Sequence, residues 1–318
     1  MAQPTTVDVL IIGGGPAGLT AALTLARQRH SAVVFDSGSY SNTRNTRLHM
    51  VPGWDNKAPA DLRKVTRDDI SRYPSVKFAD TEVQNVKKND DHFVLVDTSD
   101  KNWIGRKLIL ATGSADVYPK IEGYEENWAI GIFHCLYCHG YEESGDDRTS
   151  GVLAVDWCAN PAIAVYLSEN AAQLTSSVTI YTNGAEELGQ QIIAASGDGK
   201  KPNIDTRSIK RIKKGPKGAE VVLEFEDGNK KTEVFLVHNP ITHNKGSFAK
   251  QLGLELSPMG DIKADAPFYQ TSVRGVFAAG DCVTPYKVTP GAISSGCNAA
   301  VAASAQLQAE IFGHHSMV

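Results

Sequence analysis

The chain has 318 residues, of which 42% are apolar and 21% charged, and its formal net charge is −4. This composition predicts a globular protein of about two domains, on a prior of roughly 150 residues per domain. The charge balance argues against binding to nucleic acid or an anionic membrane, and no apolar run is long enough to span a bilayer. Five cysteines and an N-terminus without an apolar signal core do not suggest a secreted disulfide framework, so we expect a cytoplasmic enzyme.

The N-terminal segment predicts a dinucleotide-binding turn. Residues 7–12 form a short apolar run of strand length, and a helix-forming stretch covers residues 17–28. Between them, Gly13, Gly15 and Gly18 match G-x-G-x-x-G in the required strand–turn–helix context. The first glycine permits the tight turn, the second lets the backbone approach a pyrophosphate, and the third lets the helix pack on the strand. The helix N-terminus then offers free N–H groups to phosphate.

Three further predicted strand ends carry polar or glycine-rich motifs. A second strand, 32–35, ends in Asp36, about 20 residues after the glycine turn, where a carboxylate would hold ribose hydroxyls. The strand end 107–110 is followed by Ala-Thr-Gly at 111–113, and the strand end 276–279 by Gly-Asp at 280–281. An alanine-rich helix is expected at 290–311.

Cys135 and Cys138 form a C-x-x-C pair, which can close as a disulfide and reopen as a dithiol. One thiol of such a pair often has a lowered pKa, and the thiolate is the reactive form. His139 follows directly and could accept or return the proton of thiol exchange, although a merely packed histidine is an alternative. Half of a zinc site and a pair of inert buried cysteines are other interpretations. The remaining cysteines stand singly at 158, 282 and 297. We therefore favour redox chemistry and predict no metal site.

A second strand–turn–helix unit lacks the residues of a nucleotide site. Its strand is predicted at 152–155 and its helix at 161–174, but Asp156, Trp157 and Cys158 stand where a dinucleotide turn needs glycines. A side chain at the second glycine position would keep the backbone from the pyrophosphate, and the Asp156 carboxylate would repel it. The next strand, 178–181, ends without a basic residue and is followed by Glu186 and Glu187. An alternative is that another loop supplies the phosphate contacts.

In their order along the chain, these motifs resemble those of the two-domain flavoprotein disulfide reductases, and a C-x-x-C inside the inserted segment resembles the low-molecular-weight thioredoxin reductases. The resemblance implies an α/β fold of two Rossmann-like, three-layer domains. It implies a discontinuous FAD domain, 1–116 with 240–318, and an inserted domain, 117–239, with a degenerate NADPH-type site. The loop 49–53 falls where such enzymes contact flavin, with Met50 in place of the usual asparagine. The implied FAD-binding residues are Gly13, Gly14, Gly15, Pro16, Ala17, Gly18, Asp36, His49, Ala111, Thr112, Gly113, Gly280, Asp281 and Val288.

Loss of the second site narrows the resemblance to the fungal dithiol oxidases of epidithiodiketopiperazine pathways, the gliotoxin and holomycin oxidase group. These are similar to thioredoxin reductases, keep C-x-x-C, and close a disulfide in a small molecule while O2 is reduced to H2O2. The segments that carry the likeness are 133–143, 181–184, 268–273 and 280–282. The resemblance implies that Cys135 exchanges with a small-molecule dithiol, that Cys138 reduces the flavin, that His139 is the general base, and that the enzyme is a homodimer.

Two other functions remain open from the sequence. One is an NADPH-independent protein-disulfide reductase that draws electrons from ferredoxin or another donor. The other is a flavin-binding protein whose dithiol is inactive.

Overall fold

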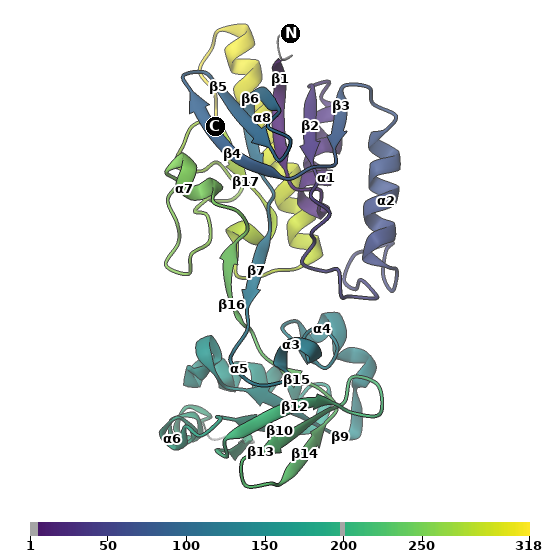
Figure 1. Cartoon of the computed structure of the whole chain (residues 1–318), viewed down its shortest axis with the longest axis vertical. Coiled ribbons are helices and arrows are strands. Elements are labelled where there is room, and N and C mark those ends of the chain that lie inside the picture. The colour runs from purple at the N-terminus through teal and green to yellow at the C-terminus, as the bar shows by residue number, and fades with distance from the viewer. Residues whose placement is uncertain (1–5, 198–200) are drawn as a thin grey trace. The chain divides into compact units, whose positions relative to one another are not determined.

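The structure is a computed structural model that describes residues 6–197 and 201–318 (Figure 1). The chain divides into two compact units, unit 1 (Met1–Ala115 with Thr242–Val318) and unit 2 (Asp116–Ile241). The two connecting strands, β7 (Ser114–Val117) and β16 (Ile241–Asn244), pair with each other. The predicted α/β fold class is confirmed.

Unit 1 is built on one mixed sheet. In its described residues the strand order is β3-β2-β1-β6-β5-β4, and β17 also pairs with β6. The pairs β3-β2, β2-β1, β1-β6 and β6-β17 are parallel, whereas β4 and β5 extend the sheet in antiparallel fashion. The strands are β1 (Thr6–Ile12), β2 (Ala32–Phe35), β3 (Val76–Ala79), β4 (Val83–Asn89), β5 (His92–Asp97), β6 (Asn102–Leu110) and β17 (Val276–Ala278).

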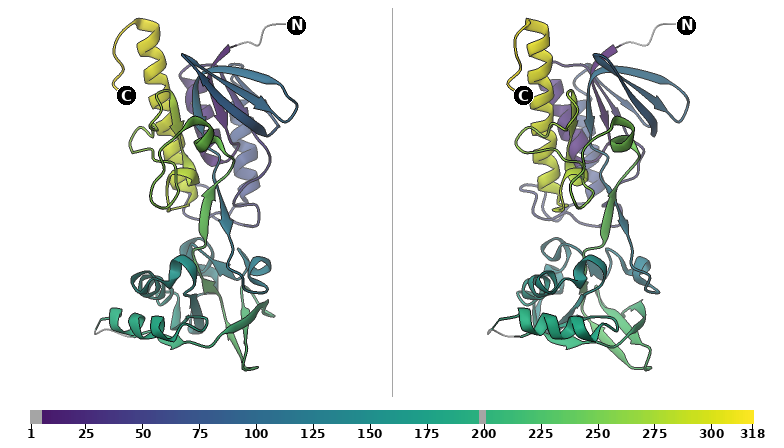
Figure 2. Two further views of the ribbon diagram at one scale, coloured as in Figure 1. Left: turned by 60° about the vertical axis from the view of Figure 1, so that its left-hand side comes forward. Right: turned by 90° about the vertical axis from the view of Figure 1, so that its left-hand side faces the viewer.

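Both faces of this sheet are buried, as expected for parallel strands. Val9 and Ile11 belong to the core cluster that contains the helices α1 (Pro16–Arg27) and α8 (Thr289–Phe312), which Figure 2 shows alongside each other. The alternate β1 residues, Leu10 and Ile12, belong to the cluster on the other face. Two further helices of unit 1 are α2 (Pro59–Ile70) and α7 (Phe248–Leu252).

Unit 2 repeats the arrangement on a smaller scale. Its described residues form a five-stranded parallel sheet of order β11-β10-β9-β15-β8 and a three-stranded antiparallel sheet of order β12-β13-β14. One face of the parallel sheet packs on α5, and the other on the β12–β14 sheet. The elements are α3 (Tyr124–Asn127), β8 (Ile132–Phe133), α4 (Leu136–His139), β9 (Gly145–Leu153), α5 (Pro161–Ala171), β10 (Thr175–Tyr181), α6 (Glu186–Ala195), β11 (Asn203–Asp205), β12 (Ile209–Lys214), β13 (Val221–Phe225), β14 (Lys230–Glu233) and β15 (Leu236–Val237).

Most predicted elements around the motifs are confirmed, with small shifts at their ends. The strand expected at 152–155 ends at Leu153, and the helix expected at 161–174 ends at Ala171. Sequence patterns did not predict α2, the antiparallel strands β4 and β5, or the β12–β14 sheet. In the described part of the chain, no helix combines the length and the apolar character needed to cross a bilayer.

Candidate functional site

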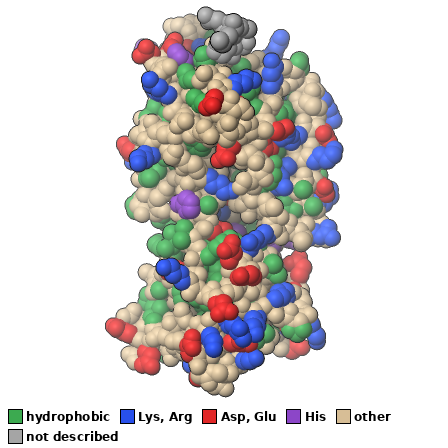
Figure 3. Space-filling model, viewed as in Figure 1, with side chains coloured by type: hydrophobic (Ala, Val, Ile, Leu, Met, Phe, Trp, Pro, Cys, Tyr) green, Lys and Arg blue, Asp and Glu red, His purple; other side chains and the backbone are tan. Residues whose placement is uncertain are grey.

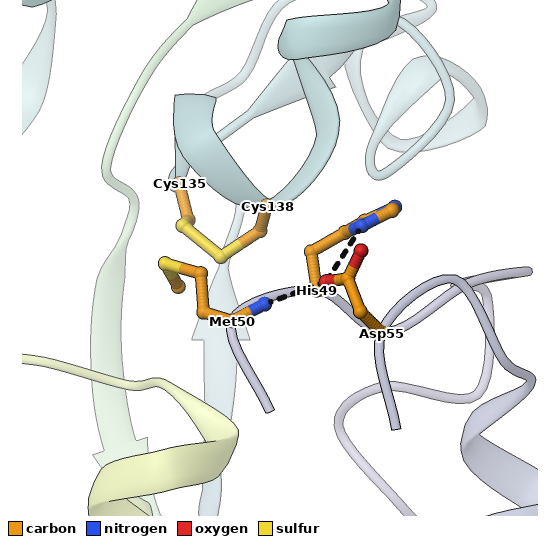
Figure 4. The surroundings of a disulfide bond; sticks show 5 residues. All are labelled: His49, Met50, Asp55, Cys135 and Cys138. Atoms are coloured by element: carbon orange, nitrogen blue, oxygen red, sulfur yellow. Dashed lines mark hydrogen bonds and ion pairs between the residues drawn. A yellow bond between two sulfur atoms is a disulfide. The ribbon is translucent and has the colours of Figure 1, made fainter. Parts of the chain in front are cut away.

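The cysteine pair is closed as a disulfide between Cys135 and Cys138 (Figure 4). Cys135 follows β8 in extended conformation and directly precedes the single-turn helix α4, which carries Cys138. The backbone N–H of Cys138 donates to the Cys135 carbonyl oxygen at 3.2 Å. Both side chains are half-buried, so a small thiol can approach this bond without unfolding of unit 2.

Two histidines, His134 and His139, flank the cysteine pair in the sequence, and each ring packs on an aromatic ring. The ring of His139, at the last position of α4, lies 5.4 Å from the ring of Phe133, and the ring of His134 lies 5.9 Å from that of Trp128. His139 is half-buried. The His139 ring thus follows Cys138 in the chain and packs against Phe133 at the end of β8. Its role in proton transfer stays a prediction.

The other cysteines do not resemble reactive thiols. Burial raises the pKa of Cys158 and that of Cys282 to about 11, so both are protonated thiols at neutral pH. Cys282 is fully buried at the start of the segment that precedes α8. Among the residues that the structure describes, no group of three or more His, Cys, Asp or Glu is arranged to hold a metal ion.

The glycine turn after β1 has the shape that a dinucleotide requires. Gly13 has a positive φ of 122°, and a Cβ there would lie 2.1 Å from the Ala111 carbonyl oxygen. A Cβ at Gly18 would lie 1.9 Å from the Gly13 oxygen, so helix and turn touch directly. A Cβ at Gly15, by contrast, would meet nothing within 4 Å, and Gly15 has no side chain to cap α1. The turn therefore fits a pyrophosphate at the N–H groups of α1.

Asp36 is held by a network that the sequence did not predict. It follows β2 and is 5% exposed. Its carboxylate accepts hydrogen bonds from the Tyr40 hydroxyl at 2.8 Å, from Arg67 Nη1 at 2.9 Å and from the backbone N–H of Gly38 at 3.0 Å. Burial and the neighbouring carboxylate raise the pKa of Tyr40 to about 12. Gly14 serves this network, because a Cβ there would lie 2.1 Å from Asp36 Cγ.

The Gly-Asp motif forms a short 3-10 helix, Gly280–Val283, after β17. Gly280 donates its N–H to Ser295 Oγ of α8 at 2.9 Å, and its φ of +79° is readily available only to glycine. Asp281 Oδ2 accepts from the Ser41 hydroxyl at 3.2 Å. Val288 is the N-cap residue of α8.

These predicted residues lie at one edge of the unit 1 sheet. The glycine turn, Asp36, the Ala-Thr-Gly motif and the Gly-Asp motif follow the parallel strands β1, β2, β6 and β17 respectively. Ligands of open α/β sheets bind at this carboxyl edge. The arrangement brings the predicted motifs together, and their contacts to FAD stay a prediction.

His49 lies in a loop of unit 1 between β2 and α2. Its Nδ1 is 3.3 Å from Asp55 Oδ1, which also accepts the backbone N–H of Met50 at 3.1 Å (Figure 4). Met50 has a positive φ of 63°. Asp55 was not predicted, and it fixes both the His49 ring and the loop backbone.

The turn after β9 differs from the glycine turn in its conformation and in the capping of the helix that follows. Asp156–Ala159 forms a 3-10 helix, and Asn160 caps α5 by accepting the N–H groups of Ala162 and Ile163 at 3.0 and 3.3 Å. The Cys158 side chain is fully buried, and its sulfur accepts the N–H of Asn239 at 3.3 Å. The prediction that this side chain stands in the path of a pyrophosphate was therefore wrong, because the thiol packs into the core instead. The N–H groups of α5 are occupied by Asn160.

Charge at this second turn also opposes a phosphorylated nucleotide. The turn carries Asp156, the first turn of α6 after β10 carries Glu186 and Glu187, and residues 149–199 contain no Lys or Arg. Arg207, after β11, is 2.6 Å from Asp205 and 3.5 Å from Asp227, so two carboxylates already neutralise it. Lys and Arg of unit 2 gather with Asp and Glu on the β12–β14 sheet instead (Figure 3). The cap at Asn160 could have been predicted from the sequence, because Asn followed by Pro is a typical start of a helix.

The fold and the cysteine pair define a disulfide oxidoreductase with two Rossmann-like units. The family pattern of the pyridine nucleotide-disulphide oxidoreductases matches residues 7–306. Thioredoxin reductase tcpT of Claviceps purpurea is 44% identical over 320 residues, covering 100% of this chain and 99% of the relative. Among solved structures, HlmI has a TM-score of 0.85 at 27% identity and covers 98% of this chain and 96% of its own. The oxidoreductase of Agrobacterium tumefaciens has a TM-score of 0.83 at 30% identity, covering 97% and 99% respectively.

The chain therefore belongs to the pyridine nucleotide-disulphide oxidoreductase family. Within that family it is a thioredoxin reductase-like oxidoreductase, and such proteins are FAD-binding flavoproteins.

Proposed function

We propose that this protein is an FAD-dependent dithiol oxidase that closes a disulfide in a small-molecule dithiol through Cys135 and Cys138. In this proposal unit 1 binds FAD through the residues at the carboxyl edge of its sheet. The glycine turn would receive the pyrophosphate at Gly15 and α1, Asp36 the ribose, and Asp281 the flavin-bearing part of the cofactor. FAD held there would supply the two-electron chemistry that links the Cys135–Cys138 dithiol to O2, with H2O2 as the product.

The observation that carries the proposal is the turn after β9. Its helix N-terminus is capped by Asn160, and its surroundings are acidic. In the described residues around this turn, a phosphorylated nicotinamide would meet no free N–H group at the start of α5 and no unpaired cation at the ends of β10 and β11. A relative with 44% identity is named a thioredoxin reductase. We infer that this chain uses the same cysteine-pair chemistry but receives its electrons from a dithiol substrate and not from NADPH.

In this proposal, electrons pass from the substrate dithiol to the cysteine pair. A substrate thiolate attacks Cys135 Sγ, the Cys135–Cys138 bond breaks, and Cys138 leaves as a thiolate. The second substrate thiolate then attacks the substrate sulfur of the mixed disulfide and releases Cys135. The substrate loses two electrons and two protons, and the cysteine pair gains the electrons.

In these exchange steps, His139 would accept the proton of a substrate thiol. An ordinary thiol has a pKa of about 8.5, so only a few per cent is ionised at pH 7, and a neighbouring base raises the reactive fraction.

Oxygen consumption by the purified yellow protein tests the proposal. Dithiols should drive uptake of O2 and release of H2O2, and NADPH should not increase either rate. Cys138→Ser should remove dithiol-driven uptake while FAD stays bound. Uptake that requires NADPH, or flavin reduction only by reduced ferredoxin, would contradict the oxidase and support a reductase.

A further inference from the structure

The two carboxylate oxygens of Asp36, at the end of β2, have different surroundings. Oδ2 accepts the Tyr40 hydroxyl at 2.8 Å and Arg67 Nη1 at 2.9 Å. It also lies against the glycine turn, because a Cβ at Gly14 would stand 2.1 Å from it. Within the described residues, Oδ1 accepts one hydrogen bond, from the backbone N–H of Gly38 at 3.0 Å. The two oxygens therefore differ in how many further donors they can accept.

Counting acceptor positions shows what the Asp36 carboxylate can still bind. An ionised carboxylate offers about four acceptor positions, shared between its two oxygens. Tyr40 and Arg67 take both positions on Oδ2, and Gly38 takes one on Oδ1. The position that is left lies on Oδ1. A ribose presents two neighbouring hydroxyl groups, so Asp36 can accept a hydrogen bond from only one of them.

Arg67, on α2, is itself held from two sides. Its Nη2 lies 2.7 Å from Asp80 Oδ1, and its guanidinium carbon lies 4.1 Å from the centre of the Phe78 ring. A guanidinium that joins two carboxylates and packs on an aromatic ring has little freedom to turn. It therefore fixes the orientation of the Asp36 carboxylate. A lysine could not reproduce this geometry, because its ammonium is a single point of charge on a flexible chain.

We propose that Arg67 is a positioning residue of the nucleotide site: with Tyr40 it occupies Asp36 Oδ2 and leaves Oδ1 to accept one ribose hydroxyl from the adenosine half of FAD. This inference rests on the proposed FAD site of unit 1. It adds the residue that orients the carboxylate, and it adds a specificity. Removal of one ribose hydroxyl should weaken binding of the nucleotide, whereas removal of the other should not.

Calorimetric titration of the whole chain, stripped of flavin, tests the single contact. The three titrants are FAD, its analogue with 2′-deoxyadenosine and its analogue with 3′-deoxyadenosine. One analogue should bind about tenfold or more weakly than FAD, because it lacks a hydrogen bond to a charged acceptor. The other analogue should bind within about twofold of FAD. A similar loss for both analogues, or no loss for either, would overturn the inference.

Variants of Arg67 separate positioning from a purely structural role. In Arg67→Met the Asp36 carboxylate is free to turn, so the ratio of the Kd of the weaker analogue to the Kd of FAD should fall towards one. Arg67→Lys should restore part of the wild-type ratio. If Arg67→Met binds FAD more weakly but keeps the wild-type ratio, Arg67 has a structural role only and the positioning role is overturned.

Arg27→Met is the matched control. Arg27 is exposed in the last turn of α1, at the opposite end from the glycine turn, and its guanidinium carbon lies 6.0 Å from the centre of the Tyr73 ring. Its Kd values should equal those of wild type. A chain that binds none of the three nucleotides would overturn the FAD site together with this inference. The expected Kd ratios in a protein without dithiol oxidase activity would support this inference and refute the oxidase.

Discussion

Gly296 tests how the helices α1 and α8 of unit 1 meet. It lies in the N-terminal half of α8, where a Cβ would stand 2.1 Å from the carbonyl oxygen of Ala17 in the first turn of α1. Both contacting groups are backbone of packed helices, so no side chain can rotate away. Gly296→Ala must therefore separate α1 from α8 by about 1 Å.

The same helix offers a matched control. A Cβ at Gly291 would meet its nearest neighbour, Val288 Cγ2, at 3.5 Å, which is ordinary contact. Gly→Ala in a helix gains about 0.8–1 kcal/mol of propensity, and overpacking of a well-filled contact costs about 1–3 kcal/mol. At Gly296 the nearest atoms are all backbone, so the overpacking cost should lie at the upper end of its range, about 2–3 kcal/mol. We therefore expect the free energy of unfolding to fall by about 1–2 kcal/mol in Gly296→Ala and to rise by up to about 1 kcal/mol in Gly291→Ala.

Denaturant unfolding followed by circular dichroism measures both values, and flavin fluorescence reports FAD release in the same titration. Because the shifted contact is at the first turn of α1, FAD should leave Gly296→Ala at lower denaturant than wild type. If Gly296→Ala unfolds at the wild-type midpoint and retains FAD equally well, the close approach of α1 and α8 is refuted.

Three further results are expected. Ellman's reagent at pH 8 should label at most one thiol per native chain, Cys297, and three after unfolding without reductant, since Cys158 and Cys282 are buried with their pKa raised to about 11; three labelled native thiols would contradict the core placement. Burial raises the pKa of Glu233, whose carboxyl accepts hydrogen bonds from Tyr181 and Thr149. The neutral carboxyl of Glu233 therefore stabilises the fold below the ordinary pKa of about 4.3, and this stabilisation is lost as the pH rises through the raised pKa. Between pH 4.5 and 8, wild type should therefore lose stability relative to Glu233→Gln in denaturant titrations, and parallel curves would count against this assignment. His139→Ala should slow anaerobic flavin reduction by dithiol about 100-fold or more and flatten its pH dependence near neutrality; an unchanged profile would remove His139 as the base.

The sequence predicted the parts of the fold that local patterns specify. The glycine turn, the apolar strand at 7–12 and the strand ends before Asp36 and Asp281 follow from local patterns. These features depend on residues that are close in the chain. The C-x-x-C pair likewise could be recognised because both cysteines lie within one turn.

The rest depends on contacts between distant segments. Arg67 reaches Asp36 from 31 residues away, and Asn239 binds the Cys158 sulfur across 81 residues. No spacing rule predicts such pairs. Cys158 is an example. The sequence showed that a cysteine stands at a position where a dinucleotide turn has glycine, but it could not show that the cysteine side chain points into the core.

We expect dithiols, and not NADPH, to reduce this protein. The most direct measurement is the flavin absorbance after anaerobic rapid mixing of the purified holoprotein with each reductant in turn. A small dithiol should bleach the flavin, and micromolar NADPH should leave the oxidised spectrum unchanged. Rapid bleaching by NADPH, with none by dithiol, would contradict the dithiol oxidase proposal.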